Sequence, residues 1–112
     1  MTSLIGQKGI PLTIKTDSEH RETRALLDVV NFRGRHVLEI GCGDGRLTWL
    51  YADQPARITA IDPNAEQIAF AKDNLPNHLR SRIEFRAVPF EDFAAESAPS
   101  IFDIAILSYS LC

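Results

Sequence analysis

The feature that most constrains the fold of this chain is a regular alternation of short apolar runs with segments of helical periodicity, which begins near Thr16. Strands that alternate with helices are typical of βαβ units, in which crossover helices join parallel strands. The sequence therefore predicts an α/β fold of the Rossmann-like, doubly wound kind, with a mostly parallel sheet and helices on both faces. Four runs are strand-like: residues 36–40 (HVLEI), 57–62 (RITAID), 82–88 (RIEFRAV) and 102–108 (FDIAILS).

The segments between these runs carry signals for helix ends. Thr16 and Glu19 have capping-box spacing and predict a helix that ends before Gly34. Asn64 is a candidate cap for a second helix, which Pro76 ends. Residues 89–100, bracketed by prolines, are expected to form a loop or a single helical turn. The apolar sides of the two helices would be Leu26, Val29 and Val30 in the first, and Ile68, Ala71 and Leu75 in the second.

Right-handed crossovers restrict the order of the four strands in the sheet. A doubly wound arrangement gives the order 3-2-1-4, with a ligand crevice at the carboxyl ends of the first and fourth strands. The third run alternates polar and apolar residues, so we expect it near a sheet edge.

The turn after the first strand contains Gly41, Gly43 and Gly45, and a helix with Leu47, Leu50 and Tyr51 follows it. Glycines lack a Cβ, so the backbone can turn tightly and approach a ligand there. Arg46 stands where the dinucleotide fingerprint has its third glycine, which weakens the case for NAD or FAD. Asp62 ends the second strand about 20 residues after the turn begins, the separation at which a carboxylate meets ribose hydroxyls.

The motifs VLEIGCGDG, ITAIDPN and FDIAILS together resemble the first, second and fourth sequence motifs of class I S-adenosylmethionine-dependent methyltransferases. The resemblance runs from about His36 to Ser108. It implies that the chain holds S-adenosylmethionine, and that the complete protein transfers the methyl group of this cofactor to an acceptor.

The resemblance also implies roles for individual residues. Glu39 would face the amino-acid end of the cofactor, and the backbone of the glycine turn would wrap its methionine and ribose part. Asp62 would bind the ribose hydroxyls, with Pro63 against the adenine. The third motif departs from the family pattern, and Phe90 or Glu91 would meet the adenine there. The implied cofactor-binding residues are Glu39, Gly41, Cys42, Gly43, Gly45, Asp62, Pro63, Phe90, Glu91 and Ser108, of which Ser108 would line the pocket beside the methyl group.

The sequence identifies no catalytic residue, because in this family most of the acceptor site follows the fourth strand. Two alternatives stay open: a cofactor-binding module without catalysis, and an NAD-dependent oxidoreductase fragment. Each candidate residue also has a structural interpretation. Asp62 or Glu39 would then only stabilise a helix start, and Glu91 would belong to an exposed loop. Cys42 is expected to be chosen for its small size rather than as a reactive thiol.

Composition restricts the partners. The chain has 112 residues with a formal net charge of −3, and its Lys and Arg residues are scattered among Asp and Glu. This gives no support for nucleic acid as a partner, and we expect a small-molecule acceptor. No apolar run approaches the length that a bilayer needs, so we expect no membrane association and a cytoplasmic location. Cys42 and Cys112 have no metal-ligand spacing, and three separated histidines (His20, His36, His78) lack a partner motif, so no metal site is expected.

We divide the chain into residues 1–35, an N-terminal segment with a scaffold helix, and residues 36–112, the cofactor-binding half. The chain stops just after a strand that should be central in the sheet, so we expect it to be truncated after the fourth strand. An unpaired edge on that strand would favour association of two copies.

Overall fold

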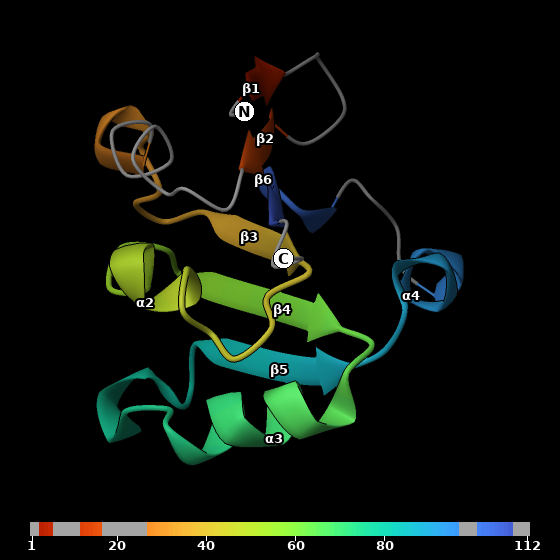
Figure 1. Cartoon of the computed structure of the whole chain (residues 1–112). Coiled ribbons are helices and arrows are strands. Elements are labelled where there is room, and N and C mark those ends of the chain that lie inside the picture. The colour runs from red at the N-terminus through yellow and green to blue at the C-terminus, as the bar shows by residue number, and fades with distance from the viewer. Residues whose placement is uncertain (1–2, 6–11, 17–26, 97–100, 109–112) are drawn as a thin grey trace.

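The computed structural model describes residues 3–5, 12–16, 27–96 and 101–108, and these form a single six-stranded sheet with helices on both faces (Figure 1). The strands are β1 (Ser3–Ile5), β2 (Leu12–Thr16), β3 (His36–Ile40), β4 (Arg57–Asp62), β5 (Ile83–Ala87) and β6 (Ile104–Ser108). The helices are α2 (Thr48–Tyr51), α3 (Ala65–Asp73), the 3-10 turn η1 (Asn77–Leu79) and α4 (Phe90–Glu96), and residues 27–29 are also helical.

The order of strands in the sheet is β1-β2-β6-β3-β4-β5. The four expected strands are β3, β4, β5 and β6, and they are parallel neighbours in the order β5-β4-β3-β6. This confirms the predicted order 3-2-1-4. The expectation that the third strand lies near an edge is also confirmed, because β5 pairs only with β4 among the described strands.

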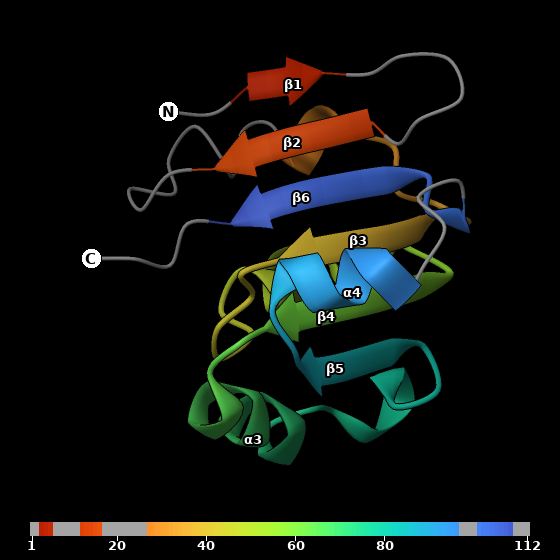
Figure 2. The ribbon, with the colours of Figure 1, turned by 90° about the vertical axis from the view of Figure 1, so that its right-hand side faces the viewer.

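The other edge of β6 differs from the expectation. β2 pairs with it in parallel, with Ile14 opposite Ile106, and β1 pairs antiparallel with β2 (Figure 2). The prediction of an unpaired edge on the fourth strand is therefore wrong, and association through this edge would require β2 to leave it. The segment LTIKT alternates apolar and polar residues and contains β-branched side chains, which suits a strand. This strand was not predicted, because it ends at Thr16, where the alternation of strand and helix signals begins.

Two apolar clusters lie on opposite faces of the sheet. On one face, Val37 and Ile58 pack with residues of α2 and α3 such as Tyr51 and Ile68. On the other face, a smaller cluster contains Leu38, Ile61, Phe93 and Phe102 beneath α4. Figures 1 and 2 show α4 over one face of the sheet and α2 on the opposite side. The alternating side chains of β3 therefore serve both faces, as expected for a central parallel strand.

The helix after β4 begins and ends as the sequence predicts. The Asn64 side chain accepts a hydrogen bond from the Gln67 N–H at 3.1 Å and caps α3. Ile68 and Ala71 are buried, and Leu75 packs at the margin of the same cluster. The predicted capping box at Thr16 differs, because Thr16 is the last residue of β2, while Glu19 and the start of that helix lie outside the described residues.

Two further expectations are wrong. Residues 90–96 form the helix α4 rather than a loop or a single turn. This helix is stabilised by buried Phe93, whose ring centroid lies 5.9 Å from that of Phe102, and by carboxylates in its first turn. In the helix before Gly34, Val30 packs against the core as predicted, whereas Val29 is 76% exposed and Leu27 is buried instead; Leu26 lies outside the described residues.

Candidate functional site

A pocket of about 270 Å³ opens at the carboxyl ends of β3 and β4, against the start of α4. Ligands of open α/β sheets bind at this end of the strands. The sequence analysis placed the crevice between the first and fourth strands, whereas this pocket lies between the first and second and is closed by the segment after the third. Its lining residues are Ile40, Gly41, Ile61, Asp62, Pro63, Val88, Pro89, Phe90 and Glu91.

The glycine turn has a conformation that requires glycine. Gly41, Gly43 and Gly45 have φ angles of 81°, 57° and 90°, in the left-handed region that other residues rarely adopt. The N–H groups of Gly41 and Cys42 donate to the Ile61 carbonyl at 2.8 and 3.1 Å. The turn is therefore folded over the end of the neighbouring strand, which brings its backbone to the pocket.

At two of these glycines there is no space for a side chain. A Cβ on Gly41 would collide with the backbone carbonyl oxygen of Ser108, at the end of β6. A Cβ on Gly45 would come within 2.8 Å of the Trp49 ring. Ser108 thus meets the glycine turn through its main chain, and the close approach of β6 occupies space beside Gly41.

Asp62 connects the turn, the second strand and the next helix. Its carboxylate accepts from the Gly43 N–H at 3.0 Å and from the Asn64 N–H at 2.8 Å, one bond to each oxygen. An ionised carboxylate has about four acceptor positions, so about two remain for a ligand. Asp62 is 8% exposed and lines the pocket, so a ligand there would meet a carboxylate held in place by backbone donors.

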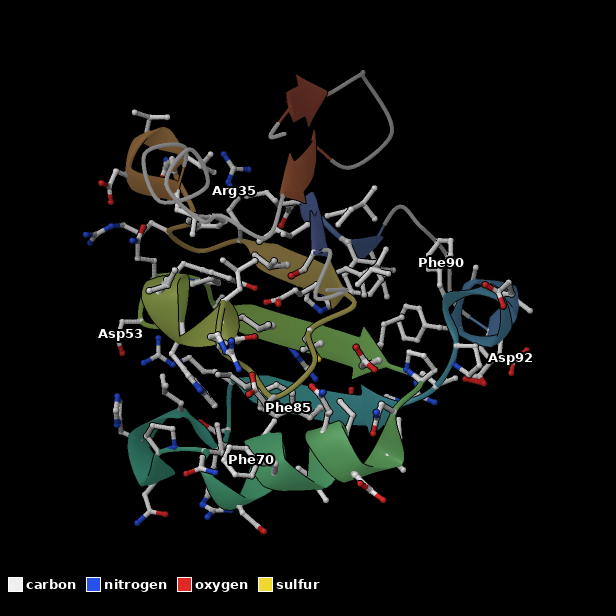
Figure 3. The ribbon with its side chains drawn as sticks, viewed as in Figure 1. Arg35, Asp53, Phe70, Phe85, Phe90 and Asp92 are labelled. Carbon is white, nitrogen blue, oxygen red and sulfur yellow. The ribbon has the colours of Figure 1, made fainter. Side chains whose placement is uncertain are left out.

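The outer wall of the pocket combines a proline, an aromatic ring and a carboxylate. Pro63 follows Asp62, and Phe90 and Glu91 begin α4. Phe90 is 44% exposed, so part of its ring is open to a ligand in the pocket. Figure 3 shows Phe90 and Asp92 on different sides of the first turn of α4. A flat, partly apolar part of a ligand would fit between this ring and the half-buried side chains of Ile40 and Val88.

Glu39 lies inside the protein rather than on the pocket wall. Its Oε1 accepts from the Thr48 hydroxyl at 2.8 Å and from the Tyr51 hydroxyl at 2.7 Å, while the buried Oε2 has no hydrogen-bond partner. Burial raises the pKa of Glu39 to about 7, although the two hydroxyl donors act in the opposite direction. The unsatisfied oxygen is the kind of buried acceptor that a cationic group or a proton would stabilise.

Cys42 is buried, and its thiol hydrogen-bonds weakly to the Gly43 carbonyl, with 3.7 Å between sulfur and oxygen. Burial, with the carboxylates of Glu39 and Asp62 nearby, raises the pKa of Cys42 well above its usual range. A thiol in this environment is a poor nucleophile. Its small volume suits the turn, in agreement with the structural interpretation.

The histidines stand apart from the pocket. His36 hydrogen-bonds through its ring to the Ile101 carbonyl and the Thr59 hydroxyl, and burial lowers its pKa. His78 pairs with Asp53 at 3.3 Å on the surface, and His20 lies outside the described residues. Among the residues that the structure describes, no group of three or more His, Cys, Asp or Glu side chains is arranged to hold a metal ion, and no helix is long and apolar enough to cross a membrane.

The structure thus gathers half of the predicted residues around one pocket and leaves the others behind it. Gly41, Asp62, Pro63, Phe90 and Glu91 line it. The others lie behind the pocket wall, in or beneath the glycine turn: Glu39, Cys42, Gly43 and Gly45. The backbone of Ser108 contacts this turn. The sequence analysis missed two sets of residues: the apolar lining of Ile40, Ile61, Val88 and Pro89, and the pair Thr48 and Tyr51 that holds Glu39. The polar pair has a sequence signal, since both hydroxyls recur one helical turn apart after the glycines.

The fold and the pocket together define a class of protein. A parallel sheet of this order, with a glycine turn after one strand and a carboxylate ending the next, is the architecture of Rossmann-like domains that bind a nucleoside portion of a cofactor. Comparison with known proteins gives the family within this class.

A family model described as a methyltransferase domain matches residues 31–111. The ubiquinone biosynthesis O-methyltransferase of Stutzerimonas stutzeri is 32% identical over 96 residues, a match that covers 84% of this chain and 36% of that protein. The human mitochondrial protein of the same name is 32% identical over 97 residues, covering 85% and 24%. The chain spans about a quarter to a third of the length of such curated relatives.

Solved structures share the fold. Precorrin 8W decarboxylase of Methanobacterium thermoautotrophicum superposes with a TM-score of 0.66 at 24% identity, over 95% of this chain and 55% of that one. The plantazolicin methyltransferase BpumL, solved in complex with SAH, gives a TM-score of 0.52 at 25% identity, over 65% and 26%. The family model matches well over half of this chain, so the chain belongs to the methyltransferase-domain family. The resemblance noted in its motifs is therefore confirmed.

Proposed function

We propose that the pocket at the ends of β3 and β4 binds the adenosine part of S-adenosylmethionine, and that the whole protein is a methyltransferase that uses this cofactor. The observation that carries the proposal is the meeting of Gly41, Asp62 and Phe90 on one pocket wall. These residues come from three separate motifs, and only the fold brings them together.

The residues suit the parts of such a cofactor. The two unused acceptor positions of Asp62 match the two adjacent hydroxyls of a ribose. The Phe90 ring and the half-buried side chains of Ile40 and Val88 offer an apolar surface for a purine. At about 270 Å³ the pocket lies just below the usual range of about 300 to 1,000 Å³ for ligand sites, so it suits a nucleoside better than a whole dinucleotide.

When bound, the sulfonium of the cofactor makes its methyl group electrophilic, so the chemistry needs mainly alignment with an acceptor. The work of the described residues is to bind and orient. The rigid glycine turn fixes the backbone against the ligand, and Asp62 fixes the sugar relative to that turn. No described residue is assigned a catalytic role.

For the acceptor we propose an oxygen atom of a small molecule, in a hydroxyl or a carboxylate group. The support comes from relatives named as O-methyltransferases of ubiquinone biosynthesis and of magnesium-protoporphyrin. The test is transfer of a radiolabelled methyl group by the full-length protein to hydroxylated aromatic compounds, with RNA and protein mixtures as competing acceptors. Labelling of RNA or protein alone would contradict a small-molecule acceptor, and cofactor binding without transfer to any acceptor would favour the non-catalytic module.

The cofactor proposal is tested by pairing a change in Asp62 with a change in the ligand. Calorimetry would compare adenosine with 2′,3′-dideoxyadenosine for the wild type and for Asp62→Asn. Each hydrogen bond to a charged group contributes about 1.5 to 3 kcal/mol, so with two ribose hydroxyls the wild type should prefer adenosine by roughly 100-fold or more. The variant should lose most of that preference, because its amide offers fewer acceptor positions.

The ratio of the two affinities is measured on the same protein, so a general loss of folded protein in the variant cancels out. Asp73→Asn, which neutralises an exposed carboxylate at the end of α3, is the matched control and should discriminate like the wild type. Equal discrimination by Asp62→Asn and the wild type would show that Asp62 does not meet the ribose. Binding of NADH with exclusion of S-adenosylhomocysteine would favour the oxidoreductase alternative.

A further inference from the structure

A second, larger pocket lies at the opposite end of the sheet from the cofactor site. Its volume is about 500 Å³, and it opens where β4 and β5 begin and α3 ends. Arg57 is the first residue of β4 and Ile83 the first of β5, so this pocket faces the amino ends of the strands. The two pockets share no lining residue.

Four cationic side chains line this second pocket: Arg57, Lys72, Arg80 and Arg82. Arg57 belongs to β4 and Lys72 to α3, whereas Arg80 and Arg82 lie together just before β5, so the fold brings three separate parts of the chain to this pocket. Glu84 is the one carboxylate on the wall. A chain with a formal net charge of −3 therefore has a local excess of positive charge here.

None of these four cations forms an ion pair with a carboxylate of the described residues. Within the described part of the chain, the ion pairs are Arg46–Asp44, His78–Asp53 and Arg86–Glu96, and none of them involves the four. Arg80 donates to the Asn77 side chain at 2.9 Å, and Arg82 donates to the Asp53 carbonyl at 3.4 Å. Each guanidinium has five N–H donors, so both retain several for a ligand.

The remaining wall is partly apolar. Leu75 is half-buried, Ile83 is buried, and Phe85 lies between β5 and α3 (Figure 3). A cavity of this size and composition suits a small molecule with an anionic end and an apolar body. Guanidinium groups bind phosphate oxygens through paired hydrogen bonds, and clustered unpaired cations attract polyanions.

The geometry points to a phosphate-binding site: the pocket formed by Arg57, Lys72, Arg80 and Arg82 binds the phosphate or pyrophosphate group of a small organic ligand. This ligand is separate from the methyl-donor cofactor. A concave pocket favours a small phosphorylated molecule over a nucleic-acid backbone, which needs an extended basic track.

Calorimetric titration with inorganic pyrophosphate, at constant ionic strength, tests the site. The wild type should bind with a dissociation constant below about 1 mM, and Lys72→Gln and Arg80→Gln should each weaken binding by about tenfold or more. Arg33→Gln removes an exposed cation outside the pocket and should change the affinity less than twofold. Asp62→Asn should leave pyrophosphate binding unchanged, which separates this site from the proposed cofactor site.

Three results would overturn the proposal. Pyrophosphate binding that is absent, or that Arg33→Gln weakens as much as Lys72→Gln, would show that no discrete site exists. A single-stranded RNA oligonucleotide that binds more tightly than pyrophosphate, with the same dependence on Lys72, would assign the surface to nucleic acid. Competition by S-adenosylhomocysteine would show that the two pockets are not independent.

Discussion

At the residue scale, the buried carboxyl of Glu39 makes the stability of the fold depend on pH. It is fully buried, its Oε2 has no partner, and its pKa is raised to about 7 from an ordinary value of 4.5. Below pH 4.5 this carboxyl is mostly protonated in both the folded and the unfolded chain, so no charge has to be buried on folding. As the pH rises to about 7 the unfolded chain ionises first, and the folded state loses roughly 3 kcal/mol of stability relative to it.

The substitution Glu39→Gln should remove this pH dependence. A neutral amide oxygen still accepts from Thr48 and Tyr51 and carries no charge to desolvate. Urea unfolding should show the variant and the wild type similar near pH 4.5, and the variant more stable by about 2 to 3 kcal/mol at pH 8. Glu66→Gln, an exposed carboxylate on α3, should behave as the wild type; equal stability of Glu39→Gln and the wild type at pH 8 would contradict burial of the charge.

Gly41 tests the close approach of the glycine turn to β6. Alanine there would combine a strained φ of 81° with a collision against the Ser108 carbonyl, and should cost more than about 2 kcal/mol in the free energy of unfolding. Gly34→Ala is the matched control, because its φ is 72° and a Cβ would meet nothing within 4 Å. It should cost about 1 kcal/mol from backbone strain alone. Equal costs in chemical unfolding would show that Gly41 is not packed against β6.

At the scale of elements, β2 was not predicted from the sequence. It pairs with the edge of β6 that we expected to be unpaired. Ile14→Pro would remove an N–H from a strand that has neighbours on both sides, and should cost about 3 kcal/mol or more. The freed edge of β6 would then promote association. Sedimentation should show concentration-dependent dimers for this variant and none for Ile14→Val; a monomeric, equally stable proline variant would contradict the pairing.

Elements with local signals were predictable, and those stabilised by distant contacts were not. Asn64 and Pro76 mark the helix α3 in the sequence, and the structure shows both ends where they predict them. The helix α4 depends on Phe93 reaching Phe102, a contact that composition does not reveal. The strand β2 depends on pairing with β6, which lies about 90 residues further along the chain.

At the scale of the whole molecule, the parallel order of four strands followed from the handedness of crossovers, and so did the end of the sheet where the first pocket opens. Asp62 was predictable because its distance from Gly41 is fixed by one strand-helix-strand unit. The second pocket was not predictable, since Arg57 and Lys72 meet only through the packing of α3 on the sheet. The cytoplasmic location and the acceptor remain predictions.

The central claim is that the pocket at the ends of β3 and β4 holds an adenosine, and a crystal structure with S-adenosylhomocysteine tests it most directly. The account predicts the ribose hydroxyls within hydrogen-bond distance of Asp62, and the adenine between Pro63 and Phe90. A ligand bound elsewhere on the chain, or an Asp62 carboxylate that contacts only Gly43 and Asn64 in the complex, would contradict it.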